Sequence, residues 1–201
     1  MLAMSFWGGL GSMVTALLWW TIDWWRPATL FGTRVGIEDV LLGIANGGTA
    51  AVLYEVVFRK RLAKMYARHG QRHILVFLVP LACFVSMSVL FYALGFSSFF
   101  ASAVSMFLAA LILVFLRPDL LVQSFATGAL MAIIMMPVYW ILIALSPGWI
   151  QATWIGRLSG LFIFGIPIED VVFYMLLGFL IGPLYEFWQG YRTRNIPTAT
   201  K

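Results

Sequence analysis

Eight carboxylate side chains occur in this chain of 201 residues, and six of them belong to two copies of one pattern. The sequence IEDV at residues 37–40 recurs at 168–171, and the pair Tyr-Glu at 54–55 recurs at 185–186. One offset of 131 residues relates both matches, which indicates an internal repeat. The candidates for chemistry are therefore the repeated acids, Glu38, Asp39, Glu55, Glu169, Asp170 and Glu186.

Paired carboxyl groups in an apolar protein can perform acid–base chemistry on a hydrocarbon. An apolar environment disfavours the ionised form of a carboxylic acid, so the acid can stay neutral and donate a proton to an alkene or epoxide. A second carboxylate would stabilise the developing cation, and aromatic walls would keep water away from it. We therefore expect the catalytic groups to be Glu38, Asp39, Glu169 and Asp170. N-terminal capping of two helices is the structural alternative for the same four residues.

Among these acids, Glu169 is the expected proton donor. Phe173 and Tyr174 lie one helical turn further along, where their rings can pack over the acids of the second copy and exclude water. Glu38 has no ring at the matching positions, so we expect it to be wetter and to act as a cation stabiliser or final base. The neighbouring aspartates would orient or hydrogen-bond the two glutamates.

Other side chains are expected to contact the substrate or to support the acids. Asn46 follows Asp39 by seven residues and returns to the same helix face, and Trp24 and Trp154 belong to a group of tryptophans expected at the outer membrane interface. Arg26 and Arg157 each precede a repeated glutamate by twelve residues. For the Tyr-Glu pairs, interfacial anchoring is the favoured role over a functional one; these are Tyr54, Glu55, Tyr185 and Glu186.

The composition excludes a water-soluble globule and a disordered chain. Hydrophobic residues make up 62% and charged residues only 10%, against about 25% charged residues in soluble domains. The long continuous apolar runs predict membrane-spanning helices rather than a barrel. Cys83 is the single cysteine and there are two histidines, so the sequence predicts no disulfide, no metal site and no cofactor. The basic residues cluster at membrane edges, which argues against nucleic-acid binding.

Hydropathy predicts an all-α integral membrane protein with six spans, at about 2–22, 36–58, 74–95, 98–116, 120–145 and 166–189. They form one transmembrane domain over 1–201, with the repeat at 26–61 and 157–192. We expect the first span to be retained rather than cleaved as a signal peptide. A basic loop at 59–73, Arg117 after the fourth span and a tail at 190–201 place ten of the thirteen Lys and Arg residues on one side. This bias predicts both termini in the cytoplasm, with the protein in the cell (inner) membrane.

Residues 166–174, IPIEDVVFY, resemble the Pro-x-Glu-Glu/Asp-x-x-Phe-Phe/Tyr signature of the small membrane lycopene cyclases of bacteria and archaea, of the heterodimeric or fused-repeat type. The sequence is also similar to related membrane terpenoid cyclases that act on prenylated molecules. The resemblance implies an isomerase or intramolecular lyase of carotenoid or isoprenoid biosynthesis, working without flavin or metal. Its partners would be a hydrophobic isoprenoid substrate and the lipid bilayer, with homo-oligomerisation left open. The first copy departs from the signature, because Gly36 replaces the proline and Leu42 and Gly43 replace the aromatic pair.

Two other functions stay open on the residues alone. Paired acids also suit a proton- or ion-coupled transporter, although such proteins usually hold ionisable groups near the membrane midplane. A non-catalytic pigment- or quinone-binding subunit would use an apolar cavity and leave the acids dispensable. For the cyclase, we expect the N-terminal ends of the spans at 36–58 and 166–189 to converge, with Glu38 and Glu169 in one cavity.

Overall fold

Long apolar helices dominate the structure, a computed structural model that describes residues 1–65, 72–156 and 159–195. Within these residues, five helical segments are long and apolar enough to cross a membrane: Leu2–Asp23, Ile37–Val57, Ser98–Leu116, Pro118–Leu145 and Ile168–Gln189. A shorter apolar helix covers Phe77–Ala93. These helices correspond to the six spans predicted from hydropathy, and the predicted all-α class is confirmed.

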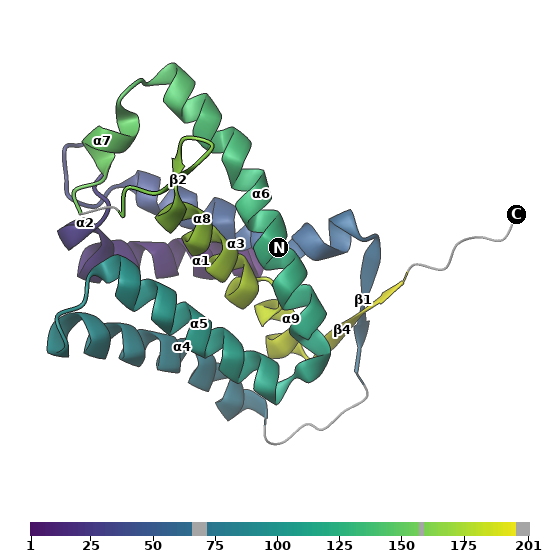
Figure 1. The fold of residues 1–201 in the computed structure, drawn as a ribbon. Helices are drawn as coiled ribbons and strands as arrows, with labels where there is room; N and C mark the ends of the chain where they lie inside the picture. Colours follow the sequence, from purple (N-terminus) through teal and green to yellow (C-terminus); the bar gives the residue numbers. More distant parts are fainter. Residues whose placement is uncertain (66–71, 157–158, 196–201) are drawn as a thin grey trace, which may run out of the picture.

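The elements follow one another as a series of helices with short strands between them (Figure 1). The first helical segment comprises α1 (Leu2–Thr15), a π-helical turn (Ala16–Trp20) and α2 (Thr21–Asp23). It is followed by α3 (Ile37–Val57), β1 (Lys60–Lys64), α4 (Arg72–Ser88) with a π-helical turn (Val89–Ala93), and α5 (Ser98–Leu116). A 3-10 turn (Pro118–Leu120) leads into α6 (Leu121–Leu145) and α7 (Trp149–Thr153). The last elements are β2 (Phe162–Ile163), β3 (Ile166–Pro167), α8 (Ile168–Ile181), α9 (Leu184–Gln189) and β4 (Tyr191–Asn195).

Each helix that carries an acidic motif packs closely against the long helix before it. Helix α3 lies against α1, and α8 lies against α6. Glycines permit both approaches: a Cβ atom added to Gly47 would lie 2.4 Å from the Met4 carbonyl oxygen, and one added to Gly178 would lie 2.7 Å from that of Thr127. The repeat in sequence therefore corresponds to two pairs of closely packed helices.

The bundle is apolar outside and partly polar inside. Large hydrophobic side chains are exposed on its surface, including Phe115 at 84% and Ile133 at 61%. Polar side chains such as Ser105, Ser124 and Thr127 are fully buried. This distribution suits a lipid surround, because lipid solvates the apolar surface while the polar side chains are kept away from it between the helices.

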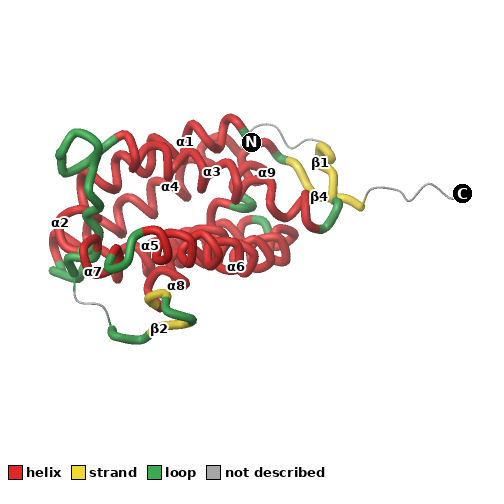
Figure 2. The backbone as a smooth tube through the Cα atoms, turned by 90° about the horizontal axis from the view of Figure 1, so that it is seen from above, coloured by secondary structure: helices red, strands yellow, loops and turns green. Residues whose placement is uncertain are grey.

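Strands β1 and β4 form an antiparallel two-stranded sheet at one end of the bundle, set apart from α2 and α7 at the other end (Figure 2). The sequence predicted a basic loop and a tail here, and residues 60–64 and 191–195 of these two segments pair as strands. Strand β1 follows α3 and strand β4 follows α9, and the two strands lie side by side. Beyond β1, the Met65 N–H donates to the Gly190 carbonyl at 3.1 Å. Since both segments lie outside the helices, pairing satisfies their backbone groups.

Candidate active site

The two motif glutamates hold the loops that precede their helices. Glu38 Oε1 accepts the backbone N–H of Leu30 at 2.6 Å, and Glu169 Oε1 accepts that of Ser159 at 2.5 Å. The two glutamates thus have matching structural contacts in the two copies. Each glutamate is bound to its own loop, and neither lines the cavity described below. That the two helix starts converge on one site stays a prediction.

The two motif aspartates have different partners, because the residue before each helix differs. Asp39 Oδ2 accepts the N–H of Gly36 at 2.9 Å and caps the start of α3. The matching residue before α8 is Pro167, which has no N–H to donate. Asp170 therefore has no capping bond to make at this position, and its carboxyl group lines a cavity instead.

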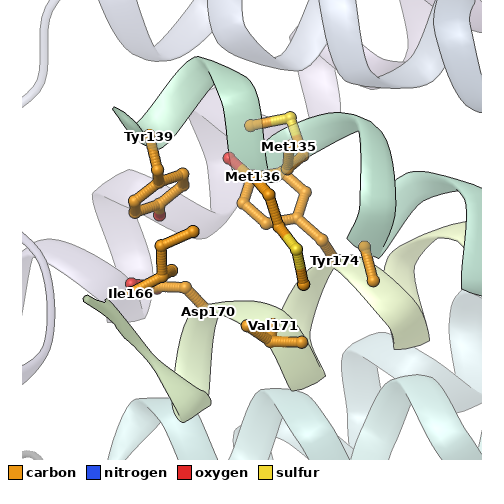
Figure 3. Close-up of a pocket in the computed structure, with 8 residues that line it drawn as sticks. Met135, Met136, Tyr139, Ile166, Asp170, Val171 and Tyr174 are labelled. Atoms are coloured by element: carbon orange, nitrogen blue, oxygen red, sulfur yellow. The ribbon is translucent and has the colours of Figure 1, made fainter. Parts of the chain in front are cut away.

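The cavity lies between α6 and α8 and encloses about 10 Å³, space for about one water molecule (Figure 3). Asp170 is 3% exposed, and its Oδ2 atom has no hydrogen-bond partner. The Tyr139 hydroxyl and the Trp154 indole lie beside the carboxyl group, and the Trp154 Nε1 atom is itself buried without a hydrogen-bond partner. Apolar and aromatic side chains complete the wall: Ala132, Met135, Met136, Ile166, Val171 and Tyr174.

Aromatic rings from α6, from α8 and from the segment after α7 surround this carboxyl group. The ring of Tyr139 lies 6.2 Å from that of Tyr174 and 6.3 Å from that of Trp154, measured between centroids. The side chain of Asn46, on α3, hydrogen-bonds to Tyr174. Asn46 and Trp154, both named from the sequence, therefore contact groups of the cavity.

The loops before α3 and α8 also meet at this end of the bundle. The Arg26 N–H donates to the Thr153 carbonyl at 2.8 Å. The Ile155 N–H donates to the Trp24 carbonyl at 3.0 Å. These bonds form a bridge between Trp25 and Trp154 and connect the two copies of the repeat next to the cavity.

The ring of Phe173 contacts tryptophans near the first helical segment rather than the cavity of Asp170. Its ring lies 5.3 Å from that of Trp20 and 5.2 Å from that of Trp24. It therefore packs on the first helical segment and does not line the cavity. Trp24 is buried in the core.

The arginine expected to support the acids caps a helix instead. Arg26 donates from Nε and Nη2 to the Thr21 carbonyl, at 3.1 and 2.8 Å, near the end of the first helical segment. Arg34 donates to the Leu17 carbonyl in the same region at 2.8 Å. Arg157 lies outside the described residues.

At the opposite end of the bundle, Gln123 joins the two Tyr-Glu motifs. Its Nε2 atom donates to Glu55 at 3.2 Å and to Glu186 at 2.8 Å. Glu186 is fully buried, whereas the neighbouring Tyr185 stacks on Tyr191 at 6.1 Å. The glutamates of this end therefore connect the two copies. Tyr54 is buried and packs against Phe58 at 5.0 Å.

Sequence reasoning missed two residues that organise these sites, Tyr139 and Gln123. Both lie in one apolar span, where a side-chain amide or hydroxyl needs a hydrogen-bond partner. A polar side chain in such a span was the signal in the sequence that could have identified them. Their partners lie 31 to 68 residues away along the chain, so spacing within the span could not identify them. Among the described residues, no three His, Cys, Asp or Glu side chains are grouped to hold a metal ion.

Comparison with known proteins gives one assignment. Residues 97–188 match the family described as lycopene cyclase. The match runs from the start of α5 into α9, and α1 and α3 lie outside it. Curated proteins and solved structures gave no match. The matched segment, residues 97–188, contains Asp170 and the other side chains of the cavity.

Proposed function

We propose that the protein is a cofactor-independent cyclase of isoprenoid chains, with Asp170 as the proton donor. The observation that carries the proposal is the unpartnered, buried Asp170 carboxyl oxygen in an aromatic cavity of the segment that matches lycopene cyclases. A carotenoid is the substrate class that the family favours, and a shorter prenylated molecule is the second substrate to test.

The proposed reaction balances as an isomerisation. The Asp170 carboxyl group transfers its proton to the terminal alkene, whose π electrons form the new C–H bond and leave a tertiary cation. A second alkene of the same chain attacks that cation, which forms the ring C–C bond and moves the charge to a new carbon. Loss of a neighbouring proton to the Asp170 carboxylate forms the ring alkene and restores the acid. No other reactant is consumed.

The side chains around Asp170 suit these steps. The Tyr139 hydroxyl orients the carboxyl group, and the aromatic rings of Tyr139 and Trp154 lie close enough to it to stabilise a cation formed there. The apolar methionine and isoleucine side chains keep the cavity dry, so that a cation is not quenched by water. The donor assigned from the sequence, Glu169, is replaced in this proposal because its carboxylate holds the loop at Ser159.

The test is expression in a host that accumulates lycopene, with pigment analysis, repeated with farnesylated and geranylgeranylated aromatic compounds. Asp170→Asn keeps the shape and removes the acid, so it should abolish the cyclised product. Asp39→Asn is the matched variant in the first copy, where the aspartate caps α3, and it should keep measurable cyclisation.

Variants of Glu169 separate the two donor assignments. Glu169→Gln retains an oxygen that can accept the Ser159 N–H, so it should remain active, whereas Glu169→Ala loses the bond and should be less stable. Normal product from Asp170→Asn would refute the donor assignment. A wild-type protein that binds lycopene without converting any of these substrates would favour a pigment-binding subunit.

A further inference from the structure

A second hollow adjoins the cavity on a neighbouring face of α6. It is a groove of about 440 Å³ between α3 and α6, a volume within the range of small-molecule sites, which is about 300–1,000 Å³. Leu53 and Val57 of α3 line one side. Ile133, Met136 and Trp140 are among the α6 residues that line the other.

The groove is open to the surroundings and its lining is apolar. Ile133 is 61% exposed and Trp140 is 47% exposed, so the groove faces the lipid around the bundle. The indole N–H of Trp140 is directed to the Phe164 carbonyl at 3.1 Å. A hydrocarbon chain dissolved in the bilayer would therefore meet matching side chains without crossing water.

Met136 is the point at which the groove meets the cavity, because its side chain lines both. Figure 3 shows it between the α6 backbone and the side of α8 that carries Asp170 and Val171. The cavity is too small to admit the end of an isoprenoid chain as it stands. Methionine has three rotatable bonds and no branch, so its movement is the least costly way to connect the two spaces.

We infer that the groove between α3 and α6 binds the hydrocarbon chain of the isoprenoid substrate, whose end group passes Met136 to reach Asp170. This inference rests on the proposed function and adds to it the path and binding site of the chain. The α6 part of the groove runs from Leu130 to Trp140, about 15 Å along the helix axis. An extended chain with its reactive end at Asp170 would lie along this length.

Photolabelling tests the groove independently of catalysis. A geranylgeranyl chain with a diazirine group is photolysed with the purified protein in phosphatidylcholine vesicles, and labelled peptides are identified by mass spectrometry. Label should concentrate at Leu53–Val57 and Ile133–Trp140, and unlabelled geranylgeraniol should displace it. Asp170→Asn should label as the wild type does, because the label reports binding and needs no proton transfer.

Two variants and one control sharpen the test. Ile133→Trp fills the groove and should lower labelling and cyclisation about tenfold, whereas Ile112→Trp places the same ring on the exposed face of α5 and should change neither. Met136→Trp closes the passage, so labelling should persist while cyclisation falls by at least about tenfold.

Label spread evenly over all lipid-facing helices, or displaced by added phospholipid, would show a lipid-filled surface and overturn the inference. Full cyclisation by Ile133→Trp would overturn it as well. Labelling of the groove in a protein that makes no cyclised product would instead count against the proposed function alone.

Discussion

At the start of α3, the Gly36 N–H and the Asp39 carboxylate form a capping interaction 2.9 Å long. At the start of α8 the same backbone position is Pro167, and the aspartate three residues later lies in the cavity. A capping bond contributes about 1 kcal/mol, so an N–H within reach stabilises the aspartate side chain at the helix end. Proline has no N–H, so at the start of α8 no such bond competes with the position of Asp170 in the cavity.

Replacing Pro167 should therefore reduce cyclisation without unfolding the protein. Pro167→Gly and Pro167→Ala both supply an N–H, which should draw Asp170 toward the cap and away from its place near Tyr139. Displacement of a catalytic group by about 1 Å can cost about 10²-fold in rate. Product formation and thermal unfolding in detergent are the two measurements.

Pro80→Ala, a change of the same type on the exposed side of α4, is the control for that pair of variants. It should leave cyclisation within the wild-type range. Undiminished product from both Pro167 variants would show that the proline does not position Asp170.

Between elements, glycines set the distance between the motif helices and their partners. Gly178 faces α6, where an added Cβ atom would also approach Met131 Cγ at 2.8 Å. Gly11 lies on α1, where an added Cβ atom would have no atom within 4 Å. The contrast separates a packing effect from the helix propensity that both glycine-to-alanine changes share.

Gly178→Ala should destabilise the protein by about 1–3 kcal/mol, because backbone atoms of α6 must move to admit the methyl group. Gly11→Ala should be neutral or stabilising, since alanine is the better helix former. Thermal unfolding of both variants in the same detergent compares them. Equal stability of the two would contradict the close packing of α6 and α8.

The helices were predictable because the hydropathy of a span depends only on residues that are close together in the sequence. Residues 98–116 were predicted as a span and form α5 with the same bounds. Proximity across the chain was not predictable in the same way. The bond between Gln123 and Glu186 joins groups 63 residues apart. The different roles of Asp39 and Asp170 depend on one preceding residue, whose effect appears only once each helix start is known.

In the whole molecule, the two ends of the bundle differ in chemistry. Asp170 and its aromatic cavity lie near α7 and the loops before α3 and α8. The basic strands β1 and β4 extend from the other end (Figure 1). Two contacts connect α3 with the second copy: Asn46, halfway along α3, contacts Tyr174, and Glu55, near the end of α3, contacts Gln123. The two motif helices thus run in the same direction, as expected for parallel repeats.

The charges of the sheet of β1 and β4 are relevant to the predicted orientation in the membrane. Its register places Arg61 opposite Arg194, and both side chains are exposed. Like charges at facing positions destabilise a strand pair, and an anionic surface close by would offset the repulsion. The cytoplasmic leaflet supplies such a surface, at about 1 kcal/mol for each basic residue near it. The sheet therefore favours the same orientation as the overall distribution of Lys and Arg.

Reporter fusions test this orientation in cells. A fluorescent protein fused after Lys201 should be bright and alkaline phosphatase at the same point inactive, because the bias of Lys and Arg residues predicts a cytoplasmic C-terminus. Phosphatase inserted after Gly148, in the turn between α6 and α7, should be active. The opposite pattern would place the basic sheet outside. Active phosphatase both at the C-terminus and after Gly148 would show that the segment from α7 to α9 does not cross the membrane. The parallel arrangement of α3 and α8 would then be wrong as well.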